Sequence, residues 1–476
     1  FLEVGGNTQL YGSFSSTQLS NGSEAYLSAS IDRSSSSVKE LRRIIPGFSP
    51  PGEFNNLGQL RFSGNFLGAF KNFTAEGELN TEIGQAEMKM KMDVRNGGDK
   101  ARYSGGLNLI DFDLGAFSGN QDLGLVNLYA DVSEGQGLRL ESLSTRILAT
   151  VEGLTYKGYT LNNFNMNGTF DGPLFNGKFD ILDEYLNFSF RGKVDLAEEL
   201  PQIDIDADIV QMHLGKLQLI ENNIQVSGRV NARIDNYKIN ELAARIKLVD
   251  FTLIQDDTLY HKIDSLLAFS QKTNDNRREI KVEAPQVELS MKGIYKPTHL
   301  WPSFQHKFKQ EYPEYADFMN INYDSSQVSP QEFTLQLTIH DTENWLKLIQ
   351  PDLDSIYQSE TTLTWNDQKD SIYFESYIPH FRRGNQDFHD AYVYLDSRSG
   401  LSNIVTYVDS ATFGRIGLES FTGQFDLNAD TLFWSLNIWD DDRSQDRFNF
   451  DGKSFLIDSN FAFRFLNKNL KFLDIS

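Results

Sequence analysis

Residues 186–194 read Leu-Asn-Phe-Ser-Phe-Arg-Gly-Lys-Val, with an apolar residue or glycine at every second position. Leu186, Phe188, Phe190 and Val194 therefore fall on one face of an extended chain, and the polar residues between them fall on the other. A period of two is the period of a β-strand. The stretch predicts a strand with one apolar face and one face in water.

The same alternation recurs along most of the chain. In residues 203–209, isoleucines and an alanine alternate with Asp204, Asp206 and Asp208, and three carboxylates on one face require that face to be solvated. The candidate residues of the apolar faces are Met88, Met90, Met92, Phe164, Met166, Phe170, Leu186, Phe188, Phe190, Val194, Ile203, Ile205, Ile209, Ile224, Val226, Val230, Val287, Leu289, Met291, Phe333, Leu335 and Leu337.

The length of the chain limits how these strands can be organised. A compact β-domain rarely exceeds about 250 residues, and the chain has 476. Strands begin roughly every 10–15 residues, as in antiparallel meanders, but we find no linkers spaced for a row of sandwiches and no short repeat typical of a β-helix. Glycines inside the strands favour a strongly curved sheet. We therefore expect an all-β fold: an elongated antiparallel array curled into an open, β-taco-like groove with a few short helices.

Helical patterns interrupt the strands in a few places. A short helix is expected near residues 37–45, stopped by Pro46. A second amphipathic stretch, 299–320, is expected to break at Pro302 and Pro313, and a third helix is expected over 341–350. We therefore divide the chain into a groove segment over 1–296, a helical interruption with one strand over 297–352, and a continuing groove over 353–476.

Composition and motifs disfavour most catalytic functions. The chain has no cysteine and a net charge of −22, which disfavours thiol chemistry, thiolate metal sites and nucleic-acid binding. Its seven histidines are scattered, and only His299 and His306 have a spacing that suggests ligands on a predicted helix. The default reading is that the histidines face solvent, so we expect no metal site, no cofactor and no enzymatic activity. A carbohydrate-active β-helix enzyme would need a pair of carboxylates that we cannot place.

The stretch 156–196, with its core TFDGPLFNGKFDILDEYLNFSFRGKVDL, resembles the TamB branch of the AsmA-like proteins, in particular its Bacteroidetes form, and residues 400–453 have the same character. The resemblance implies a periplasmic bridge in a Gram-negative bacterium. Such a bridge would carry phospholipids through an apolar β-groove from the inner to the outer membrane and support outer-membrane protein assembly. The implied partners are phospholipid acyl chains and a BamA-like outer-membrane barrel of the TamA or TamL type. An anchor in the inner membrane would lie outside this segment, because no run of about 18 apolar residues occurs in it.

A different class of protein fits the same pattern. A structural or adhesive β-repeat protein of the cell envelope would also show long amphipathic strands, but its core would be closed and packed with side chains. The two readings differ in whether the apolar faces listed above are covered by protein or open to a lipid.

Overall fold

The computed structural model describes residues 2–4, 7–17, 25–44, 50–195, 202–256, 259–273, 275–341, 353–397, 402–414, 416–418, 420–428, 431–439, 446–457 and 460–470. It divides into two units, one formed by Phe1–Arg233 with Asp250–Tyr260 and the other by Ile234–Val249 with His261–Ser476. The boundary between the units lies near residues 233–261, so the expected boundary at 296 falls inside the second unit. In the described part of the chain, no helix is both long and apolar enough to cross a membrane.

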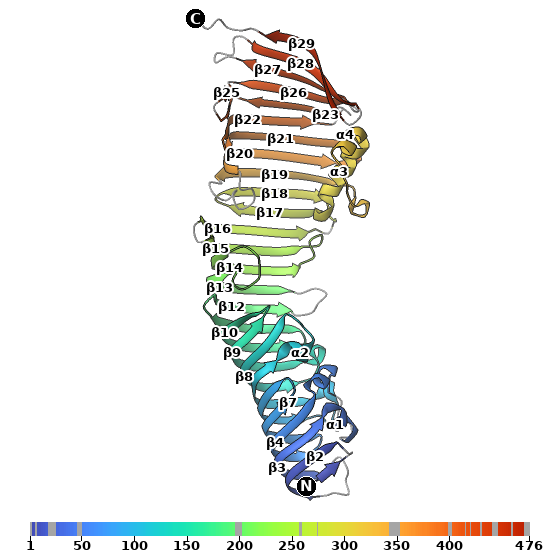
Figure 1. The fold of residues 1–476 in the computed structure, drawn as a ribbon, viewed down its shortest axis with the longest axis vertical. Coiled ribbons are helices and arrows are strands. Elements are labelled where there is room, and N and C mark those ends of the chain that lie inside the picture. The colour runs from blue at the N-terminus through green and yellow to red at the C-terminus, as the bar shows by residue number, and fades with distance from the viewer. Residues whose placement is uncertain are drawn as a thin grey trace. The chain divides into compact units, whose positions relative to one another are not determined.

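The first unit consists mainly of consecutive antiparallel strands (Figure 1). They are β1 Leu2–Val4, β2 Thr8–Thr17, β3 Tyr26–Ser37, β4 Gln59–Ala69, β5 Asn72–Thr81, β6 Gly84–Asp93, β7 Arg102–Asp113, β8 Leu123–Gln136, β9 Ser144–Tyr156, β10 Tyr159–Asp171, β11 Leu174–Leu182, β12 Leu186–Asp195 and β13 Ile203–His213. Three further strands contribute residues to both units: β14 Ile224–Asn236, β15 Ala243–Gln255 and β16 Leu259–Lys272.

The second unit continues with strands of the same kind. They are β17 Arg278–Ala284, β18 Val287–Ile294, β19 Glu332–Asp341, β20 Leu353–Asn366, β21 Ser371–Arg383, β22 Gln386–Asp396, β23 Ser402–Val408, β24 Ser410–Phe413, β25 Ile416–Leu418, β26 Phe421–Asn428, β27 Thr431–Trp439, β28 Asp446–Ile457 and β29 Asn460–Leu470. The strands β24 and β25 form a small side hairpin on β22, and β23 pairs directly with β26.

Short helices lie at strand ends in both units (Figure 1). The α-helices are α1 Val38–Ile44, α2 Leu114–Ser118, α3 Leu300–Glu311 and α4 Pro313–Phe318, and the 3-10 turns are η2 Gly52–Leu57, η3 Gly98–Lys100, η4 Leu140–Ser142, η5 Pro297–His299, η6 Ser325–Gln327 and η7 Asp367–Lys369. The expected break at Pro302 is wrong: this proline lies in the first turn of α3, where its missing N–H has no intrahelical partner to lose. The break at Pro313 is confirmed, because α4 begins there. The helix expected over 341–350 falls almost entirely outside the described residues.

The strands pair in an order that leaves the sheet of each unit open. In the first unit, pairing runs from β1 to β13 with each strand bonded antiparallel to the next. In the second, it runs from β16 to β23 and from β26 to β29. The predicted fold class, an open all-β antiparallel array that curls into a groove with a few short helices, is confirmed.

A packed apolar cluster closes one end of the strands in the first unit. Val38 of α1, Leu57 of η2 and Phe112 of β7 are buried there with Val126 of β8 and with Leu60 and Val151, and Leu114 and Phe117 of α2 pack against them. We call this group the helical plug. It also packs on Leu79, Leu109, Leu128 and Phe164 of the neighbouring strands, so it covers part of the apolar side of the sheet.

Candidate functional site: the apolar face

The registers of neighbouring strands line up the apolar positions into rows that run across the first unit. One row is Leu79, Ala86, Leu109, Leu128, Val151, Phe164, Ile181, Phe188 and Ile209. The next is Gly77, Met88, Leu107, Ala130, Ala149, Met166, Phe179, Phe190 and Ala207, and the third is Ala75, Met90, Gly105, Val132, Ile147, Gly168, Gly177, Gly192 and Ile205. On β10–β13 a fourth row follows, with Phe170, Phe175, Val194 and Ile203. We call these rows together the apolar face.

The middle of the apolar face is a layer of phenylalanine rings in mutual contact. Phe179 stacks on Phe164 with ring centroids 5.1 Å apart and on Phe190 at 4.9 Å. Phe175 meets the edge of Phe179 at 4.8 Å, and Phe188 lies 5.8 Å from Phe190. These offset and edge contacts are the geometries that aromatic rings prefer. Four of the five rings remain half-buried, so one side of the layer is accessible, whereas Phe175 is only 2% exposed.

A line of glycines marks where this face bends. Gly168, Gly177 and Gly192 are register partners on β10, β11 and β12. A Cβ atom on Gly192 would lie 2.0 Å from the carbonyl oxygen of Asp204 on the neighbouring strand. The ring of Phe175 covers the other two glycines, since a Cβ on Gly168 or Gly177 would meet it at 2.6 Å. Glycine thus permits the close strand approach that a curved sheet needs.

The opposite face of the same strands is charged and exposed. Asp204, Asp206 and Asp208 are all exposed, as predicted from their alternation with the isoleucines. Lys89 on β6 pairs with Glu76 on β5 at 3.1 Å. This face is mainly polar, although Tyr129 and Leu148 are exposed on it as well.

A carboxylate fixes the strand ends beside the phenylalanine layer. Asp183, in the turn between β11 and β12, accepts a hydrogen bond from the hydroxyl of Tyr159. It also accepts bonds at 3.0 Å from the backbone and side-chain nitrogens of Asn162 and from the backbone nitrogen of Tyr185. Partial burial favours the neutral acid, but the hydrogen bonds from Tyr159, Tyr185 and Asn162 outweigh it and hold the pKa of Asp183 below its ordinary value.

Replacing Asp183 with asparagine is expected to lower the free energy of unfolding by about 1.5–3 kcal/mol at neutral pH, the usual worth of hydrogen bonds to a charged group. Because the folded-state pKa is lowered, this stabilisation is complete above the unfolded pKa of about 3.9 and is lost as the pH falls through the folded value. Urea unfolding of both proteins across this pH range measures the difference. Asp180→Asn is the control, since Asp180 forms only a half-exposed ion pair with Lys178 at 2.7 Å. Equal losses in the two variants would contradict the role given to Asp183.

The predicted lining residues of β6, β10, β12 and β13 share the apolar face. Met88, Met90, Phe164, Met166, Phe170, Phe188, Phe190, Val194, Ile203, Ile205 and Ile209 lie in the four rows, and Met92 pairs with Phe73 and Tyr103 at their margin. Leu186 precedes a bulge and is 7% exposed. Ile224, Val226 and Val230 alternate on β14 with exposed Arg229 and Asn231, and the side-chain nitrogen of Asn231 donates to Asp206 at 2.6 Å. The polar sides of β13 and β14 therefore coincide.

The predicted lining residues of the second unit are in part core residues. Met291 and Phe333 are buried together with Tyr295 and Trp365, and Leu289 and Leu335 pack against them beside Leu300 of α3. Val287 and Leu337 lie outside this cluster and are half-buried. The apolar row through Leu289 and Leu337 then becomes polar at Thr361 and Ser376. The candidate lining is therefore most continuous in the first unit.

Several residues of the apolar face were missed by reading single strands. Phe175 and Phe179 follow a turn, and their strand carries a lysine, an asparagine and an aspartate. Phe175 and Phe179 belong to the apolar face because they pair with Phe170, Met166 and Phe190 on the two neighbouring strands. The alternation of Phe175, Gly177, Phe179 and Ile181 was the available signal, and the hairpin register was needed to use it.

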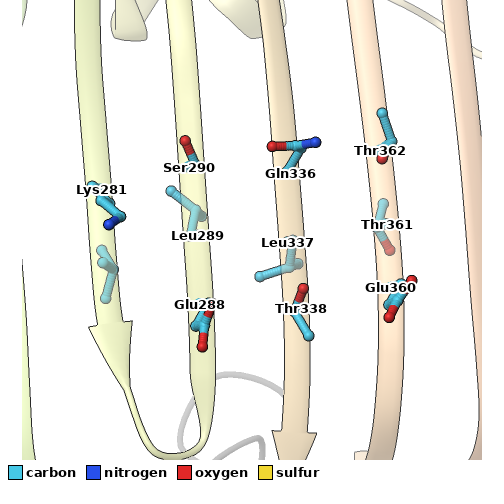
Figure 2. A pocket seen from close by; sticks show the side chains of 11 residues that line it. Lys281, Glu288, Leu289, Ser290, Gln336, Leu337, Thr338, Glu360, Thr361 and Thr362 are labelled. Atoms are coloured by element: carbon cyan, nitrogen blue, oxygen red, sulfur yellow. The ribbon is translucent and has the colours of Figure 1, made fainter.

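A hollow in the second unit has a lining of polar and apolar side chains. It lies over β17–β20 and has a volume of about 270 Å³. Its polar border is formed by Lys281, Glu288, Ser290, Gln336, Thr338, Glu360, Thr361 and Thr362, and Val282 lines it with the predicted lining residues Leu289 and Leu337 (Figure 2). Register pairs place Lys281, Ser290, Gln336 and Thr362 in one row. A row of such residues is typical of a solvated sheet surface, and we assign the hollow no ligand.

Comparisons with protein-family models, with curated proteins and with solved structures found no match to this chain.

Proposed function

We propose that this chain is part of a periplasmic bridge that carries phospholipids from the inner to the outer membrane. The observation that supports it most is the apolar face of the first unit, where rows of largely half-buried apolar residues run without a polar break from β5 to β13. The first row packs against the helical plug from Leu79 to Phe164, so the second and third rows form the candidate binding surface. At about 4.8 Å per strand, the rows extend roughly 40 Å along the sheet. An acyl chain laid along them would stay in contact with apolar side chains throughout.

The energetics of lipid binding fit such a surface. Each methylene group removed from water contributes about 0.8 kcal/mol. A charged head group would stay at the open seam in water, because its burial is costly. A continuous row also means that each step of a sliding acyl chain exchanges similar contacts, so movement along it meets low barriers.

The resemblance of residues 156–196 to the TamB branch of AsmA-like proteins supplies the rest of the proposal. It suggests the periplasm of a Gram-negative, Bacteroidetes-type bacterium, an inner-membrane anchor outside this segment, and a BamA-like barrel of the TamA or TamL type as partner. It also suggests a supporting role in outer-membrane protein assembly. The bridge needs no catalytic residue and no cofactor, because transport along it is diffusion.

The second candidate is a structural or adhesive envelope protein. The packed cluster of Met291, Tyr295, Phe333 and Trp365 under α3 favours it, because these apolar residues are covered by protein. The helical plug of the first unit has the same character. The two candidate functions differ in what covers the phenylalanine layer and the rows beside it. In the bridge these residues contact a lipid, and in the structural protein they are packed against other side chains.

Mass spectrometry of the chain purified without detergent distinguishes the two candidates. The bridge is expected to retain phospholipid in a reproducible molar ratio. A preparation that folds normally and contains no lipid would reject the bridge in favour of the structural protein.

Met166→Asp is expected to reduce the co-purified phospholipid several-fold while the protein still folds. Met166 lies in the middle row between Ala149 and Phe179, and a carboxylate there would have to be desolvated under an acyl chain. Asn167→Asp is the matched control, because Asn167 is exposed on the opposite face next to Lys178. Thermal unfolding checks both proteins. Equal lipid content in the two variants would contradict binding on the apolar face.

A further inference from the structure

Two histidines and an aspartate lie side by side on the hairpin formed by β21 and β22 in the second unit. His380 is the register partner of His389, and Asp387 lies two residues before His389 on the same strand. Residues two apart on a strand point to the same side. The three side chains therefore converge, although the two histidines are nine positions apart in the sequence.

A backbone irregularity sets the side of the sheet on which they lie. Asp390 has a φ of +48°, which is uncommon for a residue other than glycine. Beyond it, Phe381 and Phe388 stack at 4.4 Å and pack against the buried cluster of Ala391, Val408 and Ala411. The two phenylalanines are register partners next to the histidine pair, so the imidazoles face away from this core.

The ligand atoms are close enough to share one ion. Nε2 of His380 lies 2.6 Å from Oδ1 of Asp387, and Nε2 of His389 lies 3.5 Å from the same oxygen. The imidazole rings stack at 4.6 Å with an angle of 14°, and the ring of Tyr357 stacks on His380 at 6.1 Å. Within the part of the chain that the structure describes, this is the one group of three His, Cys, Asp or Glu residues whose ligand atoms all lie within 4.8 Å of one another.

We propose that His380, Asp387 and His389 form a binding site for a divalent transition metal of the zinc type. Metal–nitrogen and metal–oxygen bonds of about 2.0–2.2 Å in a tetrahedral site put ligand atoms roughly 3.3 Å apart. The distances from Oδ1 of Asp387 to Nε2 of His380 and to Nε2 of His389, 2.6 and 3.5 Å, bracket this value. Because the two rings stack, one of them must turn out of the stack before both lone pairs point at the same ion. Two imidazoles and one carboxylate suit zinc, copper or nickel better than calcium or magnesium.

A hydrogen bond alone accounts for only part of this arrangement. It explains the contact between His380 and Asp387, but His389 approaches the same oxygen at 3.5 Å, the outer limit of a hydrogen bond. A metal ion would use both imidazoles and leave a fourth position for water or a donor from another molecule. The site lies on the hairpin face opposite the core, and it stands or falls independently of lipid binding.

The test uses the untagged chain, stripped of metal with a chelator and titrated with Zn²⁺ in a calorimeter. One Zn²⁺ per chain is expected, and His389→Gln and Asp387→Asn are each expected to weaken binding by at least about tenfold, since even losses in the surroundings of a metal cost 10–100-fold. His340→Gln is the matched control, because His340 is similarly exposed and lies 3.4 Å from a single carboxylate, Glu288. His340→Gln is expected to leave Zn²⁺ binding unchanged.

Titration with Co²⁺ provides a second readout. A visible absorption band typical of four-coordinate Co²⁺, present in the parent chain and in His340→Gln but absent in His389→Gln, would support the site. No stoichiometric Zn²⁺ binding by the parent chain would overturn it. So would binding that His389→Gln and His340→Gln weaken equally. Circular dichroism of each variant shows that the second unit remains folded, and His389, being exposed, is the position least able to disturb it.

Discussion

Gly192→Ala is expected to destabilise the first unit by more than about 3 kcal/mol, a large loss for a change of one methyl group. Gly192 has a φ of +148°, a region that residues with a side chain rarely adopt. The added Cβ would lie 2.0 Å from the carbonyl oxygen of Asp204 and 2.8 Å from the Cα of Ile205. Neither backbone atom moves without breaking the pairing of β12 with β13. Urea unfolding followed by circular dichroism measures the loss.

Gly153→Ala is the control for this prediction, since it makes the same substitution in a strand of the same unit. A Cβ on Gly153 would meet only Thr160 at 3.5 Å and Asn162 at 3.9 Å, both ordinary contacts. The substitution is expected to be neutral or to stabilise by up to about 1 kcal/mol through the unfolded chain. If Gly192→Ala were as mild, the close approach of β12 and β13 would not be needed for the fold.

The period of two was sufficient to predict the strands and their faces. Residues 186–194 form β12 almost as quoted, and the three aspartates of β13 are exposed. The rows were not predictable from one strand at a time, because a row depends on the registers of many consecutive hairpins. A shift of one residue in any of them would move a strand's apolar set to the other side.

Departures from regular geometry explain what the sequence left open. In β21 and β22 the apolar positions change parity beyond Asp390, so a strict alternation would place His389 and Phe388 on the wrong sides. His380 and His389 do not have a helical ligand spacing, and only the register of β21 and β22 makes them neighbours. The register of β21 and β22 is the same on both sides of Asp390, so the change comes from the backbone conformation of Asp390 and not from a bulge.

The packing of the helical plug was also not predictable from the sequence. The sequence predicted a short helix near 37–45, and the structure has α1 at Val38–Ile44. The sequence did not predict that α1, η2 and α2 would pack together on the sheet. Their packing joins residues from 38 to 164, and only the pairing of β3–β10 brings them together. This packed end and the half-buried rows beside it are chemically similar in sequence, so mutations must separate structural core from candidate binding surface.

Val126→Asn is expected to lower the free energy of unfolding of the first unit by about 3–5 kcal/mol. Val126 is 1% exposed in the helical plug. The change removes about 1.5–3 kcal/mol of apolar burial and places an amide among apolar side chains at a further cost of about 1–3 kcal/mol. Thermal and urea unfolding measure the loss, and proteolysis within α1 and α2 is expected to become faster, because these helices depend on the plug for their packing.

Leu125→Asn is the control, because Leu125 is the adjacent residue of β8, points to the other side and is 49% exposed. It is expected to change the free energy of unfolding by less than about 0.5 kcal/mol.

The comparison with Met166→Asp then distinguishes packed core from lipid-binding surface. A polar substitution at a core residue such as Val126 should lower the free energy of unfolding. A polar substitution at a lipid-facing residue such as Met166 should reduce the amount of bound lipid, with little effect on the free energy of unfolding. If Met166→Asp unfolded the unit as Val126→Asn does, the rows would be ordinary core and the structural envelope protein would be the better assignment.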